Sequence, residues 1–250
     1  MNFFLSLIAA LLITLTSTIS YAEKIPKVLI VLTSHSQLGG TDKITGFWLP
    51  ELTHPYYELE DAGYVIDIAS IQGGIAPIDP DSYDDEDEKN NRFLKDAVLM
   101  SKVIQSIPIK NIDPSDYSAV IYSGGSGTMW DFPNNEHVNR ISKEIYESNG
   151  IVSAICHGPA ALIDVKLSDG NYLVSGRNIA SFTNDEEADL DQIEILPFLL
   201  QDKLIERGAH HVYGKSWAEN VVVDGRLITG QNPASAKQVA TKIIEHFKAK

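Results

Sequence analysis

Ile151-Val-Ser-Ala-Ile-Cys-His-Gly-Pro-Ala-Ala-Leu162 is the stretch that decides the fold. Its residues before Cys156 are apolar or small, as in a buried strand. Gly158 allows a sharp turn, and Pro159 suits a first helical turn, where its missing N–H costs nothing. We therefore predict a strand, a tight turn and a helix with a thiol at the corner, an arrangement known as a nucleophile elbow.

On both sides of this elbow, segments with continuous apolar residues alternate with segments whose apolar residues recur at helical spacing. Continuous apolar runs predict strands, and apolar residues at helical spacing predict helices between them. Strands alternating with helices indicate an α/β fold, with a mostly parallel, doubly wound sheet and helices on both faces. The predicted strands cover residues 27–33, 64–70, 117–123, 151–155 and 178–183, a hairpin turns at 224–225, and the helices cover 46–63, 93–105, 134–148, 197–207 and 236–247.

Length and composition bound the function. The chain has 250 residues, 44% of them hydrophobic, which suits one domain over residues 23–250. Its formal charge of −14 disfavours binding to nucleic acid and to anionic membrane surfaces. Many acids gather in a predicted insertion at about 73–90. We interpret this insertion as a solvated loop, because it lacks the glycine and closing glutamate of a calcium loop.

Residues 1–22 resemble a secretory signal peptide. An apolar run rich in hydroxyl side chains is followed by Ser20-Tyr-Ala22, with small residues at the positions that a signal peptidase reads. We expect a protein exported to the periplasm or secreted, with no membrane contact after cleavage. An uncleaved anchor is the alternative, and the run is short for one. The single cysteine excludes an internal disulfide.

Cys156 needs a base before it can act as a nucleophile. His157 follows it directly, but adjacent side chains on such a turn often point apart. His157 therefore serves either through its ring or only through its backbone N–H. Gly124-Gly-Ser-Gly-Thr128 ends another predicted strand, and backbone N–H groups in such a loop can stabilise an oxyanion. Alone, that loop would be an ordinary tight turn.

Two carboxylates lie after predicted strands, Glu51 and Glu187. Each is a candidate acid or base, or else an ordinary acid at a helix start. No metal site is predicted, because the one close histidine pair, His210-His211, would point to opposite faces of a strand. The glycine loop lacks the lysine and spacing of a phosphate loop, so no cofactor is predicted.

Five segments of the chain form a recognisable set in a fixed order. They are Glu51-Leu-Thr-His-Pro-Tyr56, Ser123-Gly-Gly-Ser-Gly127, Ala154-Ile-Cys-His-Gly-Pro159, Phe182-Thr-Asn-Asp-Glu-Glu187 and Val223-Asp-Gly-Arg-Leu-Ile-Thr-Gly-Gln-Asn-Pro-Ala-Ser235. Together they make the chain resemble the ThiJ/PfpI superfamily and, within it, the branch of glutathione-independent glyoxalase III and related stress chaperones. The resemblance runs from about Lys27 to Phe247.

The resemblance implies a flavodoxin-like sheet in a family whose members are often dimeric, so a homodimer is a further expectation. It implies that Cys156 is the nucleophile, with His157 beside it and Glu187 as the third catalytic position. Glu51 falls on the acid that contacts the cysteine sulfur and is expected to be protonated beside a thiolate. The backbone N–H groups of Gly125 and His157 are the candidate oxyanion hole.

The implied activity is a cofactor-independent lyase that converts methylglyoxal and water to lactate through a hemithioacetal on Cys156. Either His157 or Glu187 would be the base, and the partner is a small reactive aldehyde. A cysteine peptidase or amidase is an alternative that requires an open, peptide-sized cleft. A redox-sensitive stress chaperone is another, and an exposed apolar patch would favour it.

Overall fold

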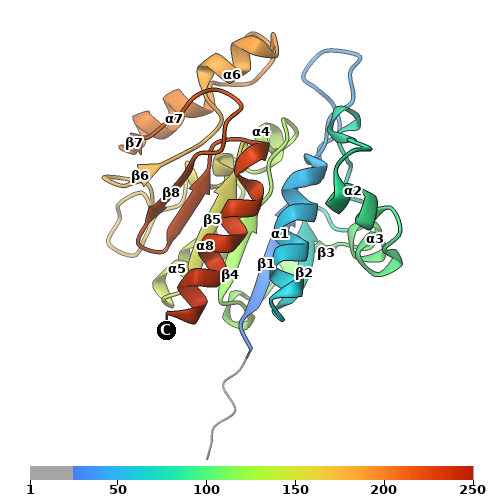
Figure 1. The fold of residues 1–250 in the computed structure, drawn as a ribbon. Helices are drawn as coiled ribbons and strands as arrows, with labels where there is room; N and C mark the ends of the chain where they lie inside the picture. The colour runs from blue at the N-terminus through green and yellow to red at the C-terminus, as the bar shows by residue number, and fades with distance from the viewer. Residues whose placement is uncertain (1–24, 250) are drawn as a thin grey trace, which may run out of the picture.

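A computed structural model describes residues 25–249 (Figure 1). Its main element is a seven-stranded sheet built from β1 (Lys27–Leu32), β2 (Val65–Ser70), β3 (Ile107–Pro108), β4 (Ala119–Tyr122), β5 (Ile151–Ile155), β8 (Val221–Asp224) and β9 (Leu227–Gly230). The strand order is β3-β2-β1-β4-β5-β9-β8, and only β8 runs antiparallel to its neighbour. The five central strands follow the 2-1-3-4-5 order of flavodoxin-like folds.

Helices cover both faces of this sheet. Helices α1 (Leu49–Asp61) and α8 (Ala236–Lys248) pack side by side on one face, and α5 (Glu136–Glu147) lies against the other (Figure 1). Two further strands, β6 (Asn178–Ile179) and β7 (His210–His211), form a separate parallel pair. The helices are α1 (Leu49–Asp61), α2 (Glu88–Phe93), α3 (Ala97–Ile104), α4 (Thr128–Asp131), α5 (Glu136–Glu147), α6 (Asn184–Asp189), α7 (Leu200–Glu206) and α8 (Ala236–Lys248).

The continuous apolar run of β1 is explained by two cores. Val28, Ile30 and Leu32 pack into the core beneath α1 and α8, whereas Leu29 and Val31 pack into the core beneath α5. Alternate side chains of a strand point to opposite faces, so a strand covered on both sides is apolar throughout. The predicted doubly wound α/β fold is confirmed.

Parallel register brings the chemically interesting segments to one edge of the sheet. Tyr122 at the end of β4 pairs with Ala154 in β5, and Ile155 pairs with Gly230 at the end of β9. The glycine loop after β4, the elbow after β5 and the segment after β9 therefore emerge next to one another. This is the carboxyl edge, where open α/β sheets bind their ligands.

Several details differ from the sequence-based expectations. Of the predicted strand 178–183, only Asn178–Ile179 (β6) pairs as a strand. The predicted helix 93–105 is α3, which begins only at Ala97 because the Asp96 side chain accepts hydrogen bonds from the Val98 and Leu99 N–H groups and caps it. Helix α2 (Glu88–Phe93) was not predicted and lies at the end of the acidic insertion. The elbow continues into a 3-10 helix, Gly158–Leu162, rather than an α-helix. The short β3 was not predicted, since two residues carry no periodicity. The hairpin at 224–225 is confirmed.

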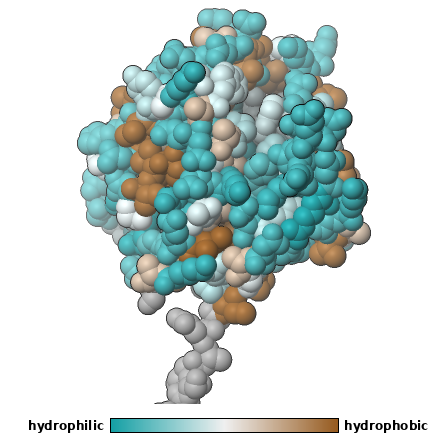
Figure 2. Space-filling view, viewed as in Figure 1, coloured by the Kyte–Doolittle hydropathy of each residue, from teal (hydrophilic) through white to brown (hydrophobic). Residues whose placement is uncertain are grey.

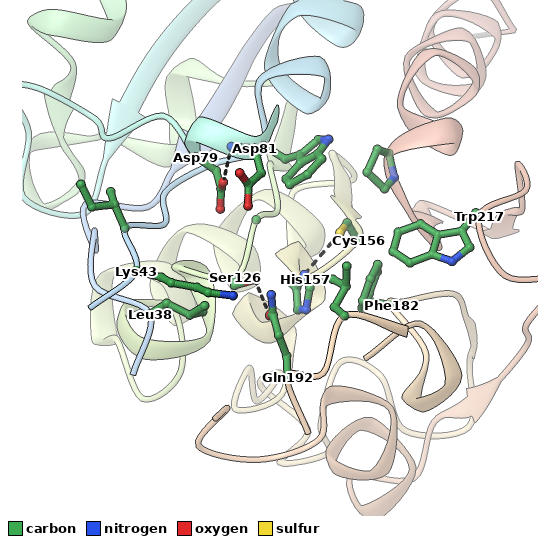
Figure 3. Close-up of a pocket in the computed structure, with 15 residues that line it drawn as sticks. Leu38, Lys43, Asp79, Asp81, Ser126, Cys156, His157, Phe182, Gln192 and Trp217 are labelled. Carbon is green, nitrogen blue, oxygen red and sulfur yellow. Dashed lines mark hydrogen bonds between the residues drawn. The ribbon is translucent and has the colours of Figure 1, made fainter. Parts of the chain in front are cut away.

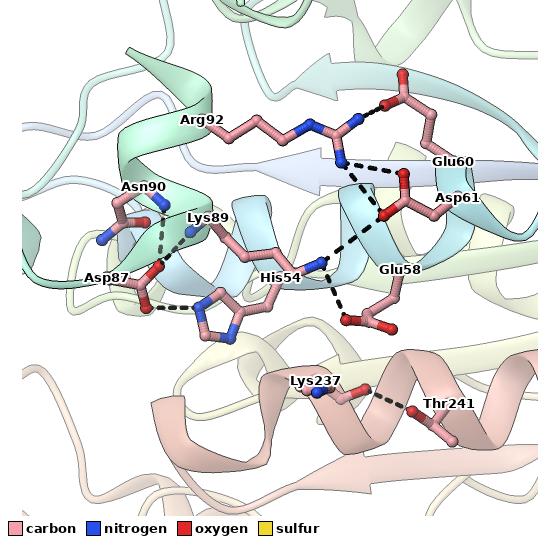
Figure 4. A network of polar contacts seen from close by, with 10 residues as sticks. All are labelled: His54, Glu58, Glu60, Asp61, Asp87, Lys89, Asn90, Arg92, Lys237 and Thr241. Atoms are coloured by element: carbon pink, nitrogen blue, oxygen red, sulfur yellow. Dashed lines mark hydrogen bonds and ion pairs between the residues drawn. The ribbon is translucent and has the colours of Figure 1, made fainter. Parts of the chain in front are cut away.

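Most of the acidic insertion is solvated, as predicted, with Asp81, Asp84, Asp85, Glu86 and Glu88 exposed, but two of its acids have structural roles. Asp79 is buried and accepts hydrogen bonds from Thr45 Oγ1 and the Asp81 N–H. Asp87 caps α2, and ion pairs then join α2 to α1 (Figure 4). Asp79 and Asp87 thus hold the insertion against the rest of the fold through hydrogen bonds, whereas the composition assigned their charges to solvent.

The predicted signal peptide, residues 1–22, lies outside the described residues. Within residues 25–249, none of the helices has both the length and the apolar character needed to cross a bilayer.

Candidate active site

Cys156 lies at the elbow in a left-handed backbone conformation, with φ of 60°. Such a conformation is strained for a residue with a side chain and persists where neighbours fix it. Here the Cys156 N–H donates to the Gly230 carbonyl and its own carbonyl accepts from Phe182, both at 2.9 Å. A Cβ at position 158 would lie 2.2 Å from the Tyr122 carbonyl oxygen, so the turn requires glycine there.

Three predicted site residues form a continuous chain. The sulfur of Cys156 lies 3.3 Å from Nδ1 of His157, and Nε2 of His157 lies 2.7 Å from Oε1 of Glu187. Both the histidine and the glutamate are buried. Phe182 packs on the imidazole with ring centroids 4.3 Å apart and fixes its plane. The His157 ring therefore faces the thiol, and its role in the reaction stays a prediction.

Glu51 approaches the same sulfur from α1. Its Oε2 accepts a 2.7 Å hydrogen bond from the Gly124 N–H, and its side chain is fully buried beside Cys156. Burial raises the pKa of Glu51 to about 8, against the opposing effects of the Gly124 and Cys156 contacts. Glu51 is therefore protonated at neutral pH, and its Oε1, which is buried without another partner, is free to donate toward the sulfur.

The thiol itself is held in its neutral form until a base acts. Burial raises the pKa of Cys156 well above its ordinary value, and negative charge on Glu51 would raise it further. A hydrogen bond from the Gly125 N–H acts in the opposite direction. Protonation of Glu51 removes this repulsion.

The backbone of the glycine loop closes tightly on the elbow. A Cβ at Gly124 would lie 2.8 Å from the His157 nitrogen, and one at Gly125 would lie 2.3 Å from the Gly46 carbonyl oxygen. Gly125 also has φ of 100°, which glycine adopts readily. The structure thus brings together the two N–H groups predicted as the oxyanion hole. Their role in catalysis stays a prediction.

A pocket of about 160 Å³ opens over these groups (Figure 3). Asp79, Asp81 and Lys43 lie on one side of it, and Phe182 and Trp217 lie on the other. The lining residues are Leu38, Lys43, Ile44, Trp48, Asp79, Asp81, Gly125, Ser126, Cys156, His157, Phe182, Leu190, Gln192, Trp217 and Pro233. The pocket therefore has a charged side and an aromatic side, with the sulfur between them.

The sequence analysis did not identify Trp217, Glu186 or the two pocket acids Asp79 and Asp81 as site residues. Glu186 completes a capping box with Thr183, in which each residue's side chain hydrogen-bonds the other's backbone N–H. The Thr-x-x-Glu spacing was readable from the sequence and identifies Glu186 as the capping acid. Asn232, just before the final helix, does not cap it, because its side chain donates to Glu186 and to the Ala218 carbonyl.

The histidine pair in β7 lies apart from the pocket residues. His210 is exposed, and Nε2 of His211 lies 2.9 Å from the Ser181 hydroxyl. Among residues 25–249, no group of three or more histidine, cysteine or acidic side chains is arranged to hold a metal ion.

Comparison with known proteins now assigns the fold and the elbow to a family. Residues 44–246 match the sequence profile of the DJ-1/PfpI family. The chain belongs to this family. The matched residues include the glycine loop, Cys156, His157 and Glu187.

Relatives that share about a third of their residues with this chain are named as glyoxalases. Glyoxalase 3 of Candida albicans is 34% identical over 239 residues, covering 88% of this chain and 98% of that protein. The glutathione-independent glyoxalase of Saccharomyces cerevisiae is 32% identical over 238 residues, covering 89% and 98%. The Rapid Encystment Protein of Francisella tularensis is similar in structure, with a TM-score of 0.86 and 42% identity over 88% of this chain and 98% of that one.

Proposed function

We propose that this chain is a glutathione-independent glyoxalase that converts methylglyoxal and water to lactate. The observation that carries the proposal is the Cys156–His157–Glu187 chain of contacts at the base of a small pocket. Relatives that bear this activity in their names match nearly their whole length.

The proposed reaction begins when His157 takes the thiol proton and the Cys156 sulfur bonds to the aldehyde carbon, while the C=O electron pair moves to oxygen. His157 then gives the proton to that oxygen, which completes the hemithioacetal and leaves His157 neutral. A base then removes the proton on that carbon, and the electron pair forms an enediolate. Return of the proton to the neighbouring carbon leaves a lactoyl thioester. Water cleaves the thioester to release lactate and restore the thiol. The net reaction is therefore methylglyoxal plus water giving lactate.

The surrounding groups suit these steps. The Gly125 and His157 N–H groups are placed to stabilise the negative oxygen, and Glu187 stabilises the imidazolium that forms when His157 holds a proton. Glu51, being protonated, adds no negative charge beside the thiolate. Either His157 or Glu187 can serve as the base at the carbon, since both belong to the same hydrogen-bonded chain.

Pocket size favours a small substrate over a peptide. An apolar cavity of about 150 Å³ in another protein holds benzene, with six heavy atoms. Methylglyoxal has five heavy atoms, and the pocket here measures about 160 Å³. The peptidase hypothesis requires an open, peptide-sized cleft, so this pocket gives it no support.

The test is lactate formation from methylglyoxal without glutathione by the purified protein and by Cys156→Ala. We expect turnover in the parent and none in the variant, because no other thiol is present in the chain. Turnover retained in Cys156→Ala would overturn the covalent mechanism. No turnover in the parent, with the elbow intact, would overturn the glyoxalase assignment.

The chaperone hypothesis has one observation in its favour. Val223 on the edge strand β8 and the nearby Val212 and Tyr213 are exposed. Figure 2 shows brown, hydrophobic residues gathered on the left of the view, at the level of β6 and β8 in Figure 1. Suppression of client aggregation that survives Cys156→Ala would support a chaperone role on this surface, and its absence would reject that role.

Export, a cleaved signal peptide and a homodimer are further proposals that rest on the sequence. The mass and first residue of the mature protein test the cleavage, and light scattering of that product tests the dimer.

A further inference from the structure

The buried carboxylate of Glu186 is next to the catalytic candidate Glu187 but points elsewhere. It is completely buried and accepts hydrogen bonds from five donors. Oε2 accepts from the N–H and hydroxyl of Thr183, at 3.0 and 2.9 Å. Oε1 accepts from the Trp217 N–H, Gln231 Nε2 and Asn232 Nδ2, at 2.9, 3.1 and 2.8 Å. No part of this carboxylate lines the pocket.

These contacts join three segments that are distant in the chain. Thr183 begins α6, the helix that carries Glu187. Gln231 and Asn232 follow β9, which lies beside the elbow strand β5. Trp217 belongs to the loop that closes the aromatic side of the pocket. One buried side chain thus sets the position of a catalytic helix, a pocket wall and the sheet edge relative to one another.

The chemistry of the five donors requires a carboxylate. All of them are neutral N–H or O–H groups, and all point at the same two oxygens. A carboxylate accepts through both oxygens, whereas an amide turns one N–H₂ group toward donors and leaves buried polar groups unpaired. Gln at this position is nearly equal in size, so it replaces one of the two acceptor oxygens with a donor and preserves the volume.

The backbone conformation of Trp217 is held by its hydrogen bond to Glu186. Its φ of 62° is left-handed and strained for a side chain of this size. Its backbone is fixed by Glu186, and its ring nitrogen donates to Asp189 at 2.8 Å. The indole then packs edge-on against Phe182, with centroids 5.5 Å apart, and Phe182 packs on the His157 ring.

We propose that Glu186 is a positioning residue that fixes the Trp217 wall and the Glu187 helix for the reaction at Cys156. It touches no reacting atom and acts through these two residues. The inference rests on the proposed glyoxalase function. It goes beyond that function because it proposes that a buried acid outside the pocket sets the shape of the pocket that receives the substrate.

The test compares Glu186→Gln with Asp185→Asn, which removes an exposed carboxylate from the same helical turn. We expect Glu186→Gln to raise KM and lower kcat, with kcat/KM reduced about 10- to 100-fold, because small misplacements of catalytic groups have effects of this size. We expect Asp185→Asn to match the parent. Acrylamide quenching of Trp217, obtained by subtracting the signal of Trp217→Phe variants, should rise only in Glu186→Gln.

A folded Glu186→Gln with parental KM, kcat and Trp217 quenching would overturn the proposal, as would an equal loss in Asp185→Asn. If Glu186→Gln does not fold, Asn232→Ala removes one donor and keeps the carboxylate. It should raise quenching and KM in the same direction by less, and parental values there would also overturn the proposal. If the parent makes no lactate, the glyoxalase assignment fails, while the quenching comparison still decides the role of Glu186.

Discussion

Two histidine–carboxylate pairs in this protein have the same separation and different surroundings. Nε2 of His157 lies 2.7 Å from Glu187, and Nε2 of His54 lies 2.7 Å from Asp87. The side chains of the first pair are 3% and 1% exposed, and those of the second are 22% and 18% exposed. Distance alone therefore says little about what such a pair does.

The partners of each pair explain the difference. The other ring nitrogen of His157 contacts the Cys156 sulfur, so the pair can move a proton to and from a nucleophile. His54 instead joins α1 to the start of α2, within a group of ion pairs (Figure 4). Burying charged groups costs stability, whereas partly exposed pairs contribute modestly to it. The buried pair is thus a candidate for function, and the partly exposed pair for folding.

Glu187→Gln should have the largest effect on activity. An amide at this position carries no charge to stabilise the imidazolium, so we expect kcat to fall about 10²- to 10⁴-fold, the usual contribution of a general acid or base. Steady-state lactate formation measures the change. The matched variant Asp87→Asn removes the carboxylate of the other pair and should keep parental kcat. Equal losses in both would mean that the two pairs do not differ in the way proposed.

The strands and the elbow could be predicted because their causes are local. Strand β1 is apolar on both faces, and Gly158 is required by a close approach to the Tyr122 carbonyl. Both features leave a direct trace in the sequence. Cys156 and the glycine loop then follow from the parallel topology, which places strand ends together.

Other parts of the site depend on contacts between distant segments. Nothing near Trp217 in the sequence signals that its N–H meets Glu186, 31 residues away. Asp79 looks like one acid among many, and only its contact with Thr45 reveals its burial. The adjacent acids Glu186 and Glu187 also differ only in three dimensions, apart from the capping-box spacing that distinguishes Glu186.

Glu51→Gln should change the pH dependence of stability. Its pKa is about 8 in the folded protein against 4.5 as the ordinary value, so the folded state keeps a proton that the unfolded state releases between these pH values. This contribution is fully present below pH 4.5 and is lost as pH rises through 8. The expected slope is about 1.4 kcal/mol per pH unit at most.

Gln mimics the protonated carboxyl because it accepts from Gly124 and donates toward the sulfur without titrating. Urea unfolding of both proteins at pH 5, 6, 7 and 8 measures the difference. The parent should lose stability relative to Glu51→Gln as pH rises. Parallel curves would show that Glu51 is ionised in the folded protein at neutral pH, against the protonated state inferred here.

Asp87→Ala should have a smaller effect, on stability only. Asp87 accepts hydrogen bonds from the Lys89 and Asn90 N–H groups at the start of α2, both at 2.9 Å. Loss of an N-cap costs about 0.5–2 kcal/mol, and Asn preserves most of a cap. The free energy of unfolding of Asp87→Ala, set beside that of Asp87→Asn, separates the cap from the pair with His54. Equal costs in the two variants would assign the whole effect to that pair.

Arg92→Gln should have the smallest effect, and the most sensitive to salt. Arg92 contacts Glu60 at 2.6 Å and Asp61 at 3.0 Å, but these groups are 38–56% exposed. Exposed pairs contribute about 0.2–1 kcal/mol, and salt weakens them because the Debye length falls from about 10 Å at 0.1 M to 3 Å at 1 M. The difference in unfolding free energy from the parent should therefore shrink at 1 M NaCl.

The loss of unfolding free energy that remains at 1 M NaCl belongs to the Arg92 guanidinium, which packs 3.9 Å above the Tyr57 ring. Salt screens this contact little, because the arginine stem and the ring exclude water. A cost that grows with salt would contradict the electrostatic origin of this network.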